Sequence, residues 1–166
     1  MTAPRWLVQA RMHLGMREIV GPKHSPVILK WLDRLKAPFR DDESAWCGTF
    51  VGGVLDEAGL APVKSPWGAR QWLKFGIALP GPAVGAIVIF WRGSKGGWSG
   101  HVGFVVGKDK AGNLMVLGGN QGNAVSIAPF QRTRVLGYRW PAGVPAPDNY
   151  DLPVLASDGK PSQNEA

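Results

Sequence analysis

Apolar positions in the first half of the chain recur at helical spacing. The stretch RWLVQARMHLG places them along one side of a helix that would end at Gly15. In SPVILKWLDRLK, Ser25 suits an N-cap and Pro26 suits the first helical position. In DDESAWCGTFVGGVLDEAG, acidic and hydroxyl residues precede an apolar run that ends at Gly59. The pattern predicts three helices, followed by a short helix over PWGARQWLKFG.

After Pro82 the pattern changes to short β-branched or aromatic runs that are separated by glycines and polar turns. The runs are AVGAIVIFWR, GHVGFVVGKD, NLMVLGG, AVSIAPF and RVLGYRW. They predict about five strands of an antiparallel sheet. Because helices come first and strands follow, the layout indicates an α+β fold rather than alternating βαβ units.

The chain of 166 residues is long enough for one hydrophobic core. From Pro141 onward it is rich in proline and polar residues and has no sustained period. We therefore expect one domain over residues 1–141 and a flexible C-terminal tail over residues 142–166.

The net charge of +7 favours partners with negative surfaces, such as nucleic acid, anionic lipid or the bacterial envelope. Zinc spacings, RNP motifs and basic helices are missing, so nucleic-acid binding has no support. The N-terminal stretch lacks the apolar core of a secretory signal, and the apolar runs are too short to cross a bilayer. We expect a monomer that is made in the cytoplasm without a signal peptide and is not inserted in a membrane.

The sequence contains one cysteine, Cys47, which cannot form an internal disulfide. It lies near the start of the third predicted helix, where a helix N-terminus lowers the pKa of a thiol. Of the three histidines, His101 opens a predicted strand, whereas His13 lies in the first helix and His24 in a loop. We therefore take His101 as the best candidate for a base that activates Cys47.

Amide side chains follow the next strand along the chain, in LGGNQGN. An amide oxygen can hold the tautomer of a catalytic histidine, and antiparallel pairing would bring this segment beside His101. Asn120 is the first choice because it directly follows the strand end, and Gln121 is the second. Taken singly, a packed cysteine, a structural histidine and turn-forming amides are all common. Their order on helix, strand and strand end favours a catalytic site.

Five segments resemble a bacterial and phage family of small cell-wall hydrolases in the NlpC/P60 and CHAP papain-like cysteine peptidase superfamily. They are DDESAWCGTFV, GAIVIFWRG, WSGHVGFVVG, VLGGNQGNAVSI and RVLGYRWP, in matching order over about residues 5–141. The resemblance implies a papain-like fold in which a cysteine at a helix start packs against the sheet that bears the histidine. It also implies cleavage of amide bonds in peptidoglycan, as by a phage or prophage endolysin, without a metal or cofactor.

The resemblance assigns roles to individual residues. Cys47 matches the nucleophile, His101 the general base and Asn120 the polar orienting residue of the family's GGNQ segment. Many CHAP enzymes carry a glutamate two positions before that asparagine, whereas this chain has Gly118. Gln121 therefore stays open as the orienting residue.

Three further residues are candidates for the substrate groove. Glu18 lies in a stretch similar to the family's E-I-x-G segment, where it would line the cleft or remain a solvated loop charge. Trp46 and Trp98 lie near the catalytic segments and are candidates for groove walls. For each tryptophan, packing in the core is the alternative.

Other functional classes fit less well. A wall-binding module with the same fold and no turnover is the main alternative, and thiol reactivity near neutral pH would separate the two. A two-carboxylate glycosidase has little support, because none of the 12 acidic residues lies in an apolar pocket motif. A zinc peptidase would need a motif such as HExxH, which is missing.

Overall fold

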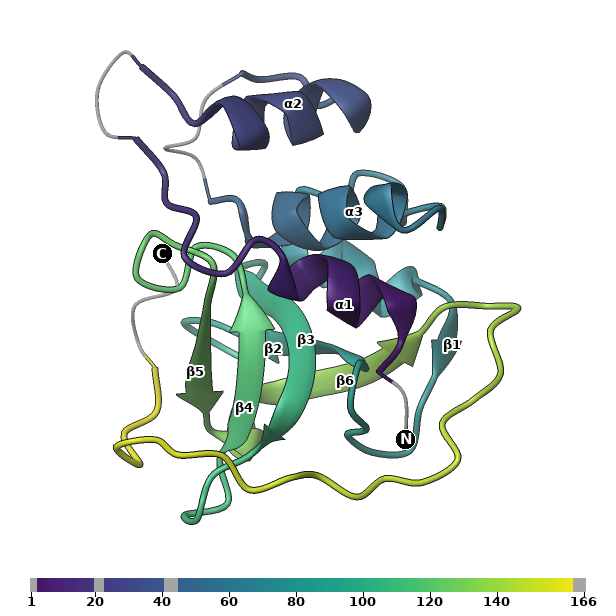
Figure 1. The fold of residues 1–166 in the computed structure, drawn as a ribbon, viewed down its shortest axis with the longest axis vertical. Helices are drawn as coiled ribbons and strands as arrows, with labels where there is room; N and C mark the ends of the chain where they lie inside the picture. Colours follow the sequence, from purple (N-terminus) through teal and green to yellow (C-terminus); the bar gives the residue numbers. More distant parts are fainter. Residues whose placement is uncertain (1–2, 20–22, 41–44, 163–166) are drawn as a thin grey trace.

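In the computed structural model, the described part of the chain comprises residues 3–19, 23–40 and 45–162. Helices lie on one side of a curved antiparallel sheet, and the chain after the last strand runs back along the sheet (Figure 1). This arrangement confirms the α+β fold expected from the sequence. No described helix has both the length and the apolar character to cross a membrane.

Three α-helices form the helical layer: α1 (Arg5–Arg11), α2 (Pro26–Arg34) and α3 (Cys47–Glu57). Helix α3 is the central one, because α1 and α2 both contact it and it packs on the sheet at β3 (Figure 1). A Cβ at Gly53 would lie 2.4 Å from the ring of Trp31. The glycines that weaken α3 as an isolated helix therefore let α2 approach closely.

The sheet has six strands in the order β1-β6-β2-β3-β4-β5, and all neighbours are antiparallel. Their bounds are β1 (Ile77–Ala78), β2 (Ile87–Trp91), β3 (Gly100–Lys108), β4 (Leu114–Gly118), β5 (Ser126–Phe130) and β6 (Val135–Trp140). The five predicted strands are confirmed. The two-residue β1 was not predicted, because its exposed pair of residues has no alternating pattern.

The predicted elements differ from the observed ones mainly at their ends. The first helix ends at Arg11, and a turn continues the chain to Gly15, which has a φ of +92°. The short helix expected over PWGARQWLKFG is the 3₁₀ helix η1 (Ala69–Lys74). Residues 41–44, where the third helical stretch was expected to begin, lie outside the described part of the chain.

The segment expected to be a flexible tail is held against the domain at several points. Val154 pairs with Lys108 in a parallel bridge at the end of β3, and Leu155 N–H donates to the carbonyl of Lys108. The Ser157 hydroxyl donates to Asp109, and Ser162 N–H donates to the carbonyl of Pro129. Sequence composition missed these contacts because they are mostly made by backbone atoms.

Candidate active site

Cys47 is the first residue of α3 and is 3% exposed. Its sulfur interacts with the backbone N–H of Val102, which directly follows His101 in β3, and with the N–H groups of Gly48 and Cys47 itself. The start of α3 therefore meets the start of β3. Burial raises the pKa of the Cys47 thiol, and these backbone groups together with the charge of Arg92 oppose that shift.

The raised pKa differs from the expectation that the helix N-terminus would lower it. Both effects act on the sulfur, but removal from water is the larger one. Burial therefore favours the neutral thiol in the resting protein.

The His101 ring is buried between aromatic side chains. It stacks on Phe130 with ring centroids 5.1 Å apart and an interplanar angle of 8°, and on Phe90 at 6.3 Å and 27°. Phe90 is the residue directly across from His101 in the neighbouring strand. The packing fixes the plane of the imidazole, so its two nitrogens point in set directions.

Gln121 holds one of these nitrogens, because His101 Nε2 lies 3.0 Å from Gln121 Oε1. The orientation of the amide follows from its other partners: Nε2 of Gln121 donates to the carbonyl oxygens of Val116 at 3.1 Å and Ser126 at 2.8 Å. The amide oxygen must then accept from His101, and the imidazole proton lies on Nε2. The buried Nδ1 of His101 carries the lone pair that a base needs.

Gly118 makes room for this contact. A Cβ at position 118 would lie 2.2 Å from Gln121 Oε1 and 3.3 Å from His101 Nε2. A glutamate at this position, as in many CHAP enzymes, would occupy the same space. The amide of Gln121 takes that space instead, so the departure from the family's pattern coincides with the contact that orients the histidine.

Asn120, the first choice from the sequence, contributes to the turn. It adopts a φ of +60°, in the left-handed region that asparagine tolerates better than most residues, and it is buried. Gln121, the second choice, accepts the hydrogen bond that defines the tautomer of the His101 imidazole. Sequence proximity to the strand end favoured Asn120, but the turn directs the next side chain back toward β3.

Two of the three candidate groove residues have structural partners. The Trp46 indole N–H donates to Glu18 Oε2 at 3.0 Å, and the Glu18 backbone N–H donates to the carbonyl of Asn123. Trp46 is 1% exposed, and a Cβ at Gly119 would lie 2.7 Å from its ring. Trp46 therefore packs in the core and is not a groove wall. Glu18 lies at the edge of the segment that bears Gln121.

Trp98 differs, because it is 89% exposed. It lies in the connection between β2 and β3, three residues before His101. Of the two tryptophans proposed from the sequence, only Trp98 has a face that a large ligand can contact.

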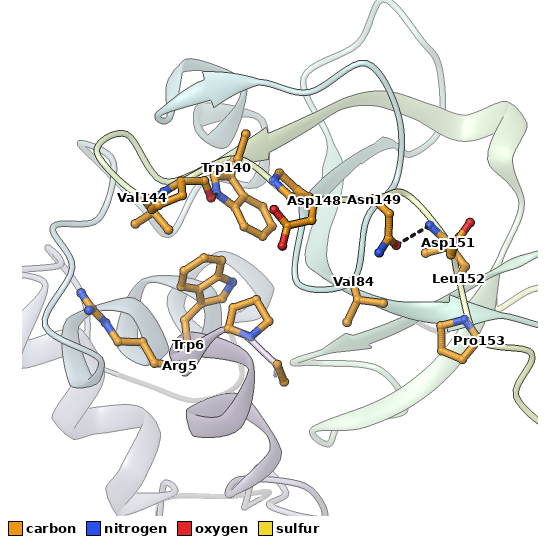
Figure 2. A pocket seen from close by; sticks show the side chains of 15 residues that line it. Arg5, Trp6, Val84, Trp140, Val144, Asp148, Asn149, Asp151, Leu152 and Pro153 are labelled. Carbon is orange, nitrogen blue, oxygen red and sulfur yellow. Dashed lines mark hydrogen bonds between the residues drawn. The ribbon is translucent and has the colours of Figure 1, made fainter. Parts of the chain in front are cut away.

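A cavity of about 850 Å³ lies elsewhere, between the start of α1 and the chain after β6 (Figure 2). Its walls include Trp6, Val84, Trp140 and Pro153, and none of the proposed catalytic residues lines it. Among the described residues, no three histidine, cysteine or carboxylate side chains are grouped as a metal site requires.

Comparison with known proteins found one family model and solved structures that are similar to this chain. The model of the CHAP domain matches residues 39–120, a range that includes Cys47 and His101. A search of curated proteins found no match. Among solved structures, an NLP/P60 family protein similar to a lipoprotein, from Staphylococcus aureus subsp. aureus Mu50, matches with a TM-score of 0.50 and 16% identity. The match covers 84% of this chain and 41% of that protein, so the chain spans less than half of its length.

The chain is thus similar to the CHAP domain over residues 39–120, and its fold is similar to that of an NLP/P60 family protein.

Proposed function

We propose that the protein hydrolyses an amide bond of peptidoglycan with Cys47 as nucleophile, His101 as general base and Gln121 as the residue that orients His101. The observation that carries the proposal is the hydrogen bond between Gln121 Oε1 and His101 Nε2, at the end of β3 that meets the Cys47 sulfur. It leaves the lone pair of the imidazole on Nδ1, where a proton can be accepted.

The first half of the reaction forms a thioester. His101 Nδ1 accepts the proton of the Cys47 thiol while the sulfur attacks the carbonyl carbon of the amide. The tetrahedral intermediate then expels the amine, which takes the proton from His101. Burial raises the pKa of the thiol, which favours transfer of this proton together with the attack.

The second half regenerates the enzyme. Water loses a proton to His101 and attacks the thioester, and the Cys47 sulfur leaves with the proton that His101 returns. Backbone N–H groups at the start of α3, which have no carbonyl acceptor within the helix, supply hydrogen bonds to the oxyanion in both halves. Each such donor contributes roughly 3 kcal/mol of transition-state stabilisation.

The biological setting that we propose is lysis of a bacterial wall by a phage or prophage endolysin. CHAP domains are generally hydrolases of the amidase or peptidase type that act on peptidoglycan, and the match to the CHAP domain over residues 39–120 supports this substrate. The net charge of +7 suits a polymer and an envelope that carry negative charge. The bond cleaved is either that between N-acetylmuramic acid and L-alanine or one within the peptides.

A second candidate function is wall binding without turnover. It is favoured by one observation: Cys47 is 3% exposed, whereas a nucleophile must meet its substrate. The two functions predict different products from the same protein, because only the first releases new amino groups.

The test is digestion of purified sacculi by the wild-type protein and by Cys47→Ala, with mass spectrometry of the released fragments. New amino groups on alanine with intact sugars would identify an amidase, and new termini within the stem an endopeptidase. We expect the variant to lose at least about 10³-fold in rate while its thermal unfolding stays unchanged. Full activity of the variant would refute the proposed nucleophile, and an inactive wild-type protein that still binds sacculi would favour the second function.

A further inference from the structure

The loop between β2 and β3, residues 93–99, is held by its own backbone hydrogen bonds and by one side chain from a distant part of the sequence. Arg70, in η1, donates from Nε to the carbonyl of Ser99 at 2.8 Å. Its two terminal nitrogens donate to the carbonyls of Lys95 at 2.9 Å and Ser94 at 2.8 Å. The guanidinium of Arg70 thus joins both arms of the loop. Because the loop is rich in glycine, it would have greater conformational freedom without these hydrogen bonds.

Trp98 projects from this loop into solvent, with 89% of its surface exposed. A rigid aromatic side chain has little conformational entropy to lose on binding. Of the four positions nearest to Trp98 in the chain, Gly96, Gly97 and Gly100 have no side chain that could cover the indole. The result is a flat, open aromatic surface on a fixed loop.

The loop lies beside the proposed reaction centre. Trp98 precedes His101 by three residues, so their Cα atoms are at most about 11 Å apart. The segment that carries Arg70 also touches the start of α3, because a Cβ at Gly48 would lie 2.2 Å from the carbonyl oxygen of Pro66. The same stretch of chain therefore supports both Cys47 and the loop.

We propose that Trp98 binds a sugar ring of the glycan strand next to the amide that is cleaved, and that Arg70 is a positioning residue for it. This inference rests on the proposed function. A sugar presents a face of C–H groups that stacks on an open indole, whereas a peptide side chain is usually held in a pocket with walls. The flat surroundings of Trp98 favour the sugar.

The experiment measures binding separately from turnover. In the Cys47→Ala background, we compare Trp98→Ala, Trp98→Phe and the control Met12→Ala, which removes another exposed apolar side chain, 72% exposed on the turn after α1. The ligands are soluble glycan strands stripped of peptide and a synthetic stem peptide without sugar. We expect Trp98→Ala to lose at least about tenfold in affinity for the glycan and none for the peptide. Trp98→Phe should retain most of the affinity, and Met12→Ala all of it.

Arg70→Gln tests the positioning role by a double-mutant cycle. The single variant should weaken glycan binding, and it should have no further effect when Trp98 is already alanine. Additive losses would show that Arg70 acts independently of Trp98. Unchanged glycan affinity in Trp98→Ala, or an equal loss for the stem peptide, would overturn the inference.

Turnover of sacculi by the protein with Cys47 intact separates this inference from the proposed function. If Trp98→Ala binds glycan normally and the wild-type enzyme is active, the sugar site is refuted and the proposed hydrolysis stands. Loss of glycan binding in a protein that releases no new amino groups would refute the proposed hydrolysis and leave a glycan-binding surface.

Discussion

The two ends of β3 both bury polar side chains, but they satisfy them differently. At the far end, Asp109 accepts from the backbone N–H groups of Ala111 and Asn113, from the Asn113 side chain and from the Ser157 hydroxyl, at 2.7–3.0 Å. At the near end, where β3 begins, His101 Nε2 lies 3.0 Å from Gln121 Oε1, and burial raises the pKa of the Cys47 thiol.

This difference separates a structural site from a reactive one. The hydrogen bonds from Asn113 and Ser157 stabilise the charged form of Asp109 and lower its pKa, so this carboxylate holds the turn and the C-terminal segment in place. Under the proposed function, the near end instead holds a thiol and an imidazole between which a proton is transferred. The predictions that follow test each end separately.

The largest effect is expected at Gln121. Gln121→Ala removes the acceptor for His101 Nε2 and frees the imidazole to adopt the other tautomer, so kcat should fall about 10²–10⁴-fold. The matched change is Asn120→Gly, which accepts the φ of +60° and should change kcat by only a few fold. Release of fragments from sacculi measures both. Equal losses in the two variants would contradict the assignment of Gln121 as the orienting residue.

A smaller loss is expected at Gly118. The added methyl group in Gly118→Ala would lie 2.2 Å from Gln121 Oε1 and would push the amide from His101. We expect a fall in kcat of about 10–10²-fold, with KM nearly unchanged. The control is Gly81→Ala, which meets nothing within 4 Å and should retain full activity. If Gly118→Ala turns over like the wild type, the contact with Gln121 does not matter for catalysis.

The raised pKa of Cys47 predicts slow alkylation of the resting protein near neutral pH. Because the pKa lies above the ordinary value of about 8.5, the thiolate fraction and the rate with iodoacetamide should rise about tenfold per pH unit from pH 7 upward. Mass spectrometry follows the modified fraction, and the unfolded protein in denaturant supplies the reference rate. A rate that is high and constant between pH 6 and 8 would show a preformed thiolate instead.

The smallest effect on activity is expected at the far end of β3. Asp109→Ala removes the acceptor of Ser157 and should lower the Tm by a few degrees, with faster hydrogen exchange over residues 153–159 and unchanged kcat. Since the pKa of Asp109 is lowered, its contribution to stability is present above the unfolded value of about 3.9 and is lost as pH falls through the folded value. A loss of turnover in this variant would show that the two ends are coupled.

The elements and the two central residues could be predicted from the sequence because they depend on local patterns. Short β-branched runs between glycines gave the strands, and the positions of Cys47 at a helix start and His101 at a strand start follow from them. The pairing of β6 with β2 has no local signal, since it joins segments about 45 residues apart in the chain.

The choice between Asn120 and Gln121 also depended on information that the sequence lacks. Which amide reaches His101 is decided by the left-handed φ at Asn120 and by the carbonyls of Val116 and Ser126, which orient the Gln121 side chain. The burial of Cys47 and Trp46 likewise results from packing between α3, the Gln121 segment and the start of β3.

The protonation state of His101 tests the central claim most directly. ¹⁵N–¹H correlation spectra of the three imidazoles at neutral pH, assigned with variants of His13 and His24, report which nitrogen carries the proton. The account predicts a neutral His101 ring with the proton on Nε2 and a bare Nδ1, and a change of this pattern in Gln121→Ala. A proton on Nδ1 of the wild-type ring, or on both nitrogens, would contradict it.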